Sequence, residues 1–554
     1  MIVDGRNVPN GTALEADVCI IGGGIAGIAM ARQFIDNPGV KVALVESGGR
    51  EWDDRTQELS EAASYGQPYF PVKETHLRVL GGTSLSYGGV CSELSALQFE
   101  ERPWVPDSGW PFGKDELDPY LPRAYRLFEI DDTDPPPAAA NGHTEWRQLG
   151  FSPPTRFGRR YAPDLDRAAN VTTCLHSTVT NLQAHPAGRH IEGAHVTTVA
   201  GNHFQIIARH YVLAGGGIEN PRLLLASNDV LATGIGNAHD NVGRYFQEHP
   251  RMTDRYRVPV GTDALAQHIT GAAGTLRFSR LGLSEQTQRA EGLLDFYANL
   301  SFGFSGQDTP QWSAVRRIIN GRRSPWRDSP YYQDIGGGPN RVRWEDVRVA
   351  LARPDRSARS LLGAALHPAF LRRWVELQSS VEQVPRRENR VVLSSARDEL
   401  GMPRAELHWT LDEREERTYR RGRDLILAEL DRLEPGLSTR RMDDPDQWPD
   451  RVIGTWHHIG TTRMHHDPRK GVVDADARVH GVDNLFVAGS SVFPNSGATG
   501  PSVTIVALSL RLKDHLISRL RAASRTGAVL EKAPPRPVGR PILTADALSV
   551  TPPR

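Results

Sequence analysis

Three widely separated segments of the chain share one pattern, in which a short apolar run ends in glycines and continues into a helix-forming stretch. The first segment covers residues 16–46, with apolar runs at 16–21 and 41–46 and helix-forming residues at 25–35. Apolar runs that are almost free of charge on both faces are typical of buried parallel strands. This segment therefore predicts a strand, a helix and a second strand, which together form a βαβ unit.

The same pattern returns at residues 211–227 and 485–512, where an apolar run again precedes glycines and a helix. Pro501 opens the last predicted helix, and the fixed φ of proline suits the first helical position. Since the three units lie hundreds of residues apart, they predict one sheet that is assembled from distant segments. Residues 251–450 differ, because alternating strand-like segments there are interspersed with Arg-rich helical stretches that read as a solvated surface.

Composition and charge exclude several classes of function. The 66 Lys and Arg residues balance 66 Asp and Glu residues, so no uniformly basic field favours a nucleic acid or membrane partner. No apolar run is long enough to span a membrane, and residues 1–17 lack the apolar core of a signal peptide. The three cysteines are odd in number and far apart, which argues against a disulfide framework or thiolate zinc. We therefore expect a cytoplasmic protein.

Gly22, Gly24 and Gly27 form a GxGxxG motif between the first predicted strand and helix. Glycines at these places allow a tight turn, close approach of the backbone to a pyrophosphate, and close packing of the helix on the strand. Glu46 ends the next strand 46 − 27 = 19 positions later, where a carboxylate accepts hydrogen bonds from a ribose hydroxyl. The motif predicts a bound adenine dinucleotide, either NAD or FAD.

Residues 78–92 are rich in glycine and cannot form a regular helix, so their backbone amides are free to contact a ligand. Together with NVGRYFQEHP at 241–250, HHIGTTRM at 457–464 and the segment 487–512, they resemble the glucose–methanol–choline (GMC) family of flavoprotein oxidoreductases. Bacterial pyranose and sugar oxidase-like members are the most similar. The resemblance covers about residues 14–520 and favours FAD over NAD.

The resemblance implies a discontinuous, Rossmann-like α/β domain for FAD at residues 12–250 and 451–520, with substrate-site insertions around 90–160. Residues 251–450 are expected to form an α+β substrate-binding domain whose antiparallel sheet is covered by helices. Residues 521–554 are predicted to be a Pro-rich tail. The expected cofactor-binding residues are Gly22, Gly24, Gly27, Glu46, Arg78, Gly81, Gly82, Thr83, Tyr87, Gly88, Val179, Gly215, Gly489, Ser490, Gly500 and Pro501.

Family members with covalently bound FAD carry a histidine in the glycine-rich loop. Residues 81–86 read GGTSLS, so we expect FAD to be held non-covalently.

His457 is the candidate catalytic base. A neutral imidazole with a pKa near 6.5 is suited to accept an alcohol proton at physiological pH. The resemblance agrees, because the family's catalytic histidine stands before a Gly-Thr pair, as His457 stands before Gly460 and Thr461. Two alternatives stay open: His458 is the base, or both histidines are structural. The histidines at 457, 458, 465 and 466 fit no zinc-binding spacing, so no metal is expected.

Gly500 departs from the family pattern, since it stands where the family places an Asn or a second His as partner of the base. Asn495, Thr499 or His458 is expected to substitute, unless His457 acts alone. The missing side chain also leaves room for a bulky substrate. Glu382 and Gln383 are predicted to hydrogen-bond substrate hydroxyls from a strand, with simple solvation as the alternative.

These residues predict FAD-dependent oxidation of an alcohol on a sugar, aminosugar or glycoside. His457 would accept the hydroxyl proton as hydride moves to flavin N5. One alternative continues from an aldehyde hydrate to the acid. Others are a redox-silent FAD lyase similar to hydroxynitrile lyases and a non-catalytic flavoprotein. The expected partners are a small-molecule alcohol and an electron acceptor, oxygen or another.

Overall fold

The computed structural model describes residues 1–130, 138–139, 142–153, 155–260, 265–266, 278–307, 309–323, 342–366, 368–444 and 448–526. The predicted tail lies outside these residues from 527 onward, as does part of the Arg-rich region. Residues 521–526 belong to a helix that runs to Thr526, so the prediction of a tail from 521 is wrong for these six residues.

The first sheet has eight strands and combines all three predicted strand-and-glycine units. Strand β11 pairs in parallel with both β2 and β18, which confirms a sheet built from segments far apart in sequence. Its strands, in spatial order with β18 placed beside β11, are β1 (Ile2–Asp4), β8 (Val171–Leu175), β3 (Val42–Val45), β2 (Ala13–Ile21), β11 (His203–Leu213), β18 (Leu485–Val487), β10 (Ile191–Thr197) and β9 (Thr178–Ala184).

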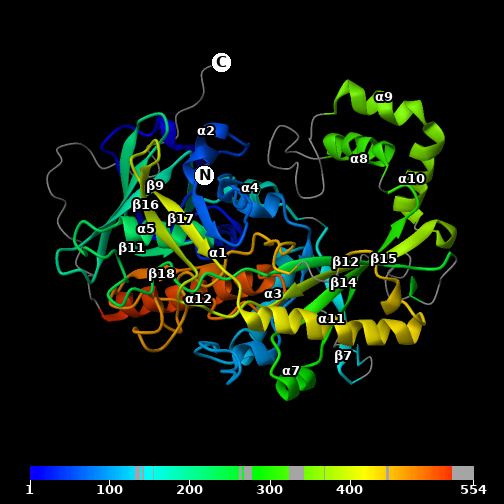
Figure 1. Cartoon of the computed structure of the whole chain (residues 1–554). Helices are drawn as coiled ribbons and strands as arrows, with labels where there is room; N and C mark the ends of the chain where they lie inside the picture. The colour runs from blue at the N-terminus through cyan, green and yellow to red at the C-terminus, as the bar shows by residue number, and fades with distance from the viewer. Residues whose placement is uncertain are drawn as a thin grey trace.

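Helices α1 and α12 pack against each other beside this sheet (Figure 1). Helix α1 spans Ile25–Phe34 and α12 spans Ser502–Thr526. A Cβ at Gly27 would lie 1.9 Å from the Gly22 carbonyl oxygen, so glycine is what lets α1 approach the strand end closely. Further helices of this part are α2 (Asp54–Gln57), α3 (Leu121–Leu127), α4 (Phe157–Arg167) and α5 (Gly216–Ala226).

The second sheet has a buried apolar face and a polar face. Its strands are β12 (Arg251–Arg257), β15 (Arg372–Val381), β14 (Phe296–Phe304), β13 (Phe278–Leu283), β7 (Thr144–Phe151), β5 (Val90–Cys91) and β6 (Ala138–Ala139). Leu281, Leu300 and Leu377 share a core with residues of helix α11 (Glu413–Leu433), which runs along this face (Figure 1). The alternation of strand side chains turns intervening polar residues to the opposite side.

Three helices project from the far end of the second sheet (Figure 1). They are α8 (Pro310–Arg323), α9 (Trp344–Ala352) and α10 (Pro354–Leu366). The short helix α7 (Glu285–Glu291) follows β13. None of the described helices is long and apolar enough to cross a membrane.

A third, three-stranded sheet connects distant parts of the chain. It contains β16 (Arg390–Arg397), β17 (Pro403–Trp409) and β4 (Ala63–Gly66). Strands β16 and β17 confirm that residues 251–450 contain strand-like segments, and β4 pairs with β17 in parallel. Strands β4 and β17 lie on opposite sides of the predicted boundary at 250, and their pairing neither supports nor contradicts it. The division into domains at 250 and 450 stays a prediction.

Candidate active site

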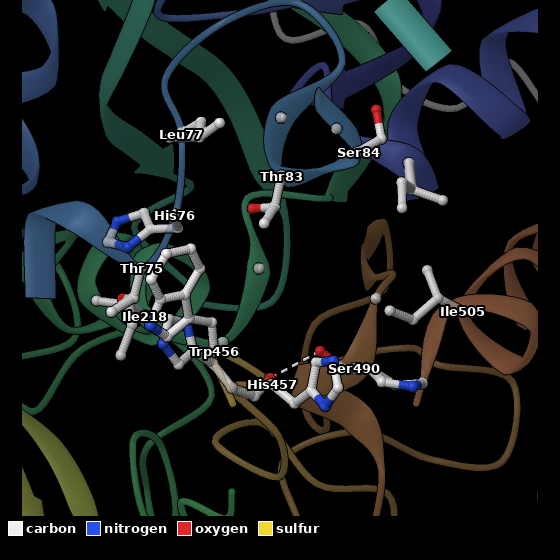
Figure 2. A pocket seen from close by; sticks show the side chains of 18 of the residues that line it. Thr75, His76, Leu77, Thr83, Ser84, Ile218, Trp456, His457, Ser490 and Ile505 are labelled. Carbon is white, nitrogen blue, oxygen red and sulfur yellow. Dashed lines mark hydrogen bonds between the residues drawn. The ribbon is translucent and has the colours of Figure 1, made fainter. Parts of the chain in front are cut away.

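A cavity of about 1000 Å³ lies among the first sheet, the second sheet and the loops that follow the glycine-rich turns. Side chains of Leu77 and Thr83 face those of His457 and Ser490 across it (Figure 2). Every glycine-rich segment singled out in the sequence contributes to this one cavity, although the segments are hundreds of residues apart.

The glycines at one end of the cavity form a backbone cradle. A Cβ placed on Gly24, Gly216 or Gly489 would meet no atom within 4 Å, so a side chain at each would project into open space. Helix α1 begins directly after Gly24, which makes no side-chain cap, so the first N–H groups of the helix are available to a ligand. A helix N-terminus with uncovered amides fits a pyrophosphate.

Glu46 lines the same cavity with a buried carboxylate. Its Oε2 accepts the Gly23 N–H at 2.7 Å and its Oε1 accepts the Gly48 N–H at 2.8 Å. Burial raises the pKa of Glu46, while these two backbone donors oppose that rise. A carboxylate has about four lone-pair positions, so Glu46 can still accept from ribose hydroxyls. The residues present fit an adenine dinucleotide.

Most predicted cofactor-binding residues line the cavity, and two do not. Gly27 packs helix α1 on its strand, as described above. The Gly81 N–H donates to the Gly23 carbonyl at 2.7 Å, which holds the loop onto the first glycine turn. Those that line it are Gly22, Gly24, Glu46, Arg78, Gly82, Thr83, Tyr87, Gly88, Val179, Gly215, Gly489, Ser490, Gly500 and Pro501.

His457 lines the cavity beside Gly500, with its Cε1 3.9 Å from the position that a Gly500 Cβ would take. The preceding Trp456 has a φ of +64°, a left-handed conformation that is costly for a bulky residue. Consecutive residues from 453 to 458 all reach the cavity wall as a result of this irregular path. Burial lowers the pKa of His457 well below 6.5, and the nearby His249 and Arg251 add to this effect.

His249 is the hydrogen-bonding partner of His457, with the two Nδ1 atoms 2.9 Å apart. The Nε2 of His249 lies 3.4 Å from the Ser496 carbonyl oxygen, which can only accept, so this nitrogen carries the proton. Burial lowers the pKa of His249 to about 4, so its ring is neutral and its Nδ1 is an acceptor. The His457 Nδ1 must then carry a proton and donate it to His249.

This chain of hydrogen bonds determines the tautomer of His457. Its Nδ1 also lies 3.1 Å from the Thr455 Oγ1, whose hydroxyl donates to Glu248 and which therefore has lone pairs to accept with. With Nδ1 protonated in both contacts, the Nε2 of neutral His457 keeps its lone pair. His457 is thereby prepared to accept a proton at Nε2.

Glu248 organises the residues around both histidines. Its Oε2 accepts the backbone N–H groups of His249, Thr455 and His457 at 3.1, 3.0 and 3.2 Å, and also the Thr455 hydroxyl at 3.0 Å. Its Oε1 accepts the hydroxyl of Tyr69. A fully buried carboxylate with this many donors orients the His457 backbone and places a negative charge behind the imidazole.

His458 is held differently from His457. Its Nε2 lies 3.1 Å from the Tyr69 oxygen, and its carbonyl accepts the Ser490 hydroxyl at 2.7 Å. Because Tyr69 gives its proton to Glu248, its oxygen is the acceptor and the His458 Nε2 is the donor. Burial lowers the pKa of His458 to about 3. His458 reaches the cavity wall, but its Nε2 is protonated and donates to Tyr69, unlike the Nε2 of His457.

Of the expected substitutes for the missing family Asn, His458 lines the cavity, whereas Asn495 and Thr499 do not. Asn495 accepts the Gly109 N–H at 3.2 Å and donates to the Gln98 carbonyl at 2.8 Å. Thr499 accepts from Arg280 at 2.7 Å and bonds with Ser92. The structure brings His249 to His457 instead. His249 stands in the segment 241–250, which carried part of the resemblance.

Glu382 and Gln383 do not line the cavity, so the prediction that they face substrate is wrong. Glu382 forms a fully buried ion pair with Arg102, at 2.8 Å between Oε2 and Nη1. Gln383 accepts the Trp409 indole N–H at 3.0 Å and the Glu248 N–H at 2.8 Å. Both residues follow the last residue of β15 and satisfy buried donors, which is what buried polar groups require.

Sequence reasoning missed the cavity wall that the second sheet provides. Five polar-face residues of its strands line the cavity: Arg251, Arg280, Tyr297, Asn299 and Gln378. Their positions face one side of a sheet whose other side is the apolar core. The dinucleotide cradle, the imidazole at the cavity wall and this polar wall fit a flavin-dependent alcohol oxidoreductase.

Comparisons with known proteins agree. Residues 385–509 match the family model described as GMC oxidoreductase. The 6'''-hydroxyparomomycin C oxidase of Streptomyces lividus is 25% identical over 91% of this chain and 92% of that protein. Fructose dehydrogenase large subunit of Gluconobacter japonicus is 26% identical over 57% of this chain, and the match spans about half, 48%, of its length.

The fold agrees with a solved structure as well. Pyridoxine 4-oxidase from Mesorbium loti aligns with a TM-score of 0.53 at 16% identity, covering 90% of this chain and 99% of that one. Over residues 385–509 the chain resembles GMC oxidoreductases, and it is an FAD-dependent enzyme that acts on alcohol groups.

Proposed function

We propose that the protein oxidises a carbinol on a sugar or glycoside, with His457 as the base. The observation that carries this proposal is the hydrogen-bond chain from Ser496 through His249, which leaves the His457 Nε2 unprotonated at the cavity wall. The relatives support a sugar substrate, since one is named for a paromomycin derivative and another for fructose.

FAD, when bound, supplies the two-electron acceptor that takes the carbinol hydrogen with its electron pair. The His457 Nε2 takes the hydroxyl proton, and the carbon–oxygen bond of the substrate becomes a carbonyl. The imidazolium that results keeps its Nδ1–H bonds to His249 and Thr455, and the Glu248 carboxylate behind them offsets the new positive charge. Residues around His457 therefore stabilise the proton after it has moved.

Helix α12 contributes at the same place. Gly500, Pro501 and Ser502 line the cavity, so the N-terminal end of this 25-residue helix is directed at it. The positive end of a helix dipole stabilises nearby negative charge by about 0.3–2 kcal/mol. This end favours acceptance of an electron pair by a cofactor that lies against it.

Anaerobic mixing tests the proposal. Sugars and glycosides are expected to bleach the flavin absorbance of the intact protein. His457→Ala should retain FAD and lose about 10²- to 10⁴-fold in reduction rate, the range for a positioned base, while His458→Ala loses much less. Equal losses, or the reverse order, would assign the wrong histidine. A substrate consumed without bleaching would identify a redox-silent lyase.

We also propose that FAD is held without a covalent bond. Gly82, Thr83, Ser84 and Ser86 from the glycine-rich loop line the cavity, and none of them carries an imidazole or a thiol. After denaturation in acid and centrifugation, the yellow colour should stay in the supernatant. Colour that remains in the pellet would contradict this.

A further inference from the structure

The cavity wall formed by the second sheet has a defined arrangement of polar side chains. Arg280 on β13 pairs with Asn299 on β14, which pairs in turn with Gln378 on β15. In the neighbouring row, Tyr297 on β14 pairs with Ser380 on β15, which pairs with Arg251 on β12. Residues that are paired across antiparallel strands share a face, so both arginines belong to one polar surface.

Arg251 stands beside the candidate base. Its backbone pairs with Ile453, which lines the cavity four residues before His457. Its positive charge contributes to the lowered pKa values of both His457 and His249. Arg280 approaches from the other side, where it donates to Thr499, the neighbour of Gly500, and lies over the Tyr297 ring at 4.2 Å.

Arg251 has no carboxylate partner among the described residues. Its side chain makes one long contact, 3.5 Å from Nε to the Ser380 hydroxyl. Two arginines nearby on the same sheet are neutralised: Arg255 pairs with Asp443 at 3.0 Å and Arg147 pairs with Glu145. A half-buried guanidinium that faces a cavity and lacks an anion is incomplete, because its donor fork suits a carboxylate or a phosphate.

The charges that line the cavity favour an anion near His457. Among the described lining residues the carboxylates are Glu46 and Glu219. Glu46 is bound by backbone amides, as above, and Glu219 pairs with Arg78 at 2.7 Å and with Arg222 at 3.2 Å. Neither carboxylate pairs with Arg251, so the cavity lining leaves the positive charge of Arg251 without a carboxylate partner.

We propose that the substrate is an anionic sugar or hydroxy acid, whose carboxylate or phosphate is bound by Arg251 within the field of Arg280. This rests on the proposed oxidation of a carbinol at His457, and it specifies which carbinols are taken. The anion anchors one end of the substrate on β12, and a carbinol a few bonds away then lies at the His457 Nε2. Aminosugars are disfavoured, since an ammonium group would meet the same positive wall.

Matched substrates that differ in charge test the proposal on the FAD-loaded enzyme. The set is methyl α-glucopyranoside, methyl α-glucuronopyranoside, glucose 6-phosphate, glucosamine and glycerate. Anaerobic flavin reduction is measured for each at low and high ionic strength. We expect at least one anionic compound to show a KM roughly 10-fold or more below that of its neutral counterpart, with the advantage reduced by salt. The uronate and phosphate arms distinguish the two kinds of anion.

Variants separate recognition of charge from damage to the fold. Arg251→Gln should raise the KM of the anionic substrate roughly 10- to 100-fold more than that of its neutral counterpart, the value of a charged hydrogen bond. Arg251→Lys should retain part of the preference, since the charge stays. Arg255→Gln, on the same strand but outside the cavity, is the matched control and should leave both substrates unaffected. FAD content and unfolding temperature are measured for every variant.

The outcomes separate this inference from the proposed function. Neutral glycosides that reduce the flavin as well as the anionic ones would overturn the inference and keep the proposed function. Reduction by glycerate but by no sugar would support the anion site and refute the sugar substrate. If no compound reduces the flavin, calorimetric titration with the uronate and with glucose 6-phosphate decides, and absence of binding that depends on Arg251 overturns the inference.

Discussion

Replacing His249 by leucine tests whether hydrogen bonding behind the base controls its tautomer. His249 does not line the cavity, so the substitution removes no contact with the cavity's contents. It removes the Nδ1 lone pair to which His457 donates at 2.9 Å. The Thr455 oxygen at 3.1 Å then remains as the described acceptor for the His457 Nδ1–H. The unprotonated Nε2 should be populated less often, and proton transfer should slow.

The expected size follows from the number of acceptors that are lost. One neutral hydrogen bond contributes about 0.5–1.5 kcal/mol, so His249→Leu should slow flavin reduction roughly 2- to 13-fold. Adding Thr455→Val removes the second acceptor, for a combined loss of roughly 5- to 150-fold. Loss of the base itself sets the upper limit of about 10²- to 10⁴-fold. The predicted order is therefore single variant, double variant, then His457→Ala.

The assay is the anaerobic rate of flavin reduction, with FAD content and unfolding temperature recorded for each protein. His249→Gln should recover most of the rate, because its amide oxygen can accept in place of the imidazole nitrogen. His210→Leu is the matched control, since His210 is a buried histidine of β11 that does not line the cavity. It should reduce its flavin at the unmodified rate.

Two results would refute the reasoning. If His249→Leu and the double variant with Thr455→Val both react at the unmodified rate, the tautomer of His457 does not depend on these acceptors. A loss for His249→Leu as large as that for His457→Ala, without recovery in His249→Gln, would show that the imidazole of His249 takes part in the reaction itself.

Three further predictions concern the pKa of His457, the space beside Gly500 and the buried pair of Arg102 and Glu382. Because burial lowers the pKa of His457 and the neutral ring is the base, kcat/KM should stay high as pH falls through 6.5 and decline below it; a decline centred at or above 6.5 contradicts this. Gly500→Asn should crowd the space 3.9 Å from the His457 ring and slow bulky glycosides roughly 10²-fold while small alcohols react as before; unchanged selectivity would leave Gly500 as a backbone requirement. Arg102→Met leaves the buried Glu382 without its partner and should lower the free energy of unfolding by about 3–5 kcal/mol. The double variant with Glu382→Leu should recover most of this loss. A single variant as stable as the parent would refute the importance of the buried pair.

Most residues that the sequence predicted for dinucleotide binding line one cavity. Gly22, Gly24 and Glu46 act within one short βαβ unit, where residue type and spacing determine the turn and the strand end. The strand–glycine–helix pattern also repeats in recognisable form around Gly215 and before Pro501. Local conformation is decided by neighbours in the chain, so these elements can be read without the fold.

The substrate end of the cavity was predicted poorly. Glu382 and Gln383 are residue types that often bind ligands, yet both accept hydrogen bonds from donors inside the protein. Arginine is usually found at the solvated surface, yet Arg251 and Arg280 both line the cavity. The difference depends on which face of a sheet each residue occupies and on what packs against that face, and neither is set by the residue's own neighbours in sequence.

The sequence by itself indicated the resemblance to GMC oxidoreductases, the glycine-rich cradle and His457 as the candidate base, because each depends on short runs of residues. The tertiary structure alone decided the partner of that base. His249 and His457 are 208 positions apart in the sequence, and their Nδ1 atoms lie 2.9 Å from each other. This contact depends on how the distant segments of the chain pack together. A one-residue shift in a strand turns every side chain to the opposite face, so a contact of this kind is a property of the assembled fold.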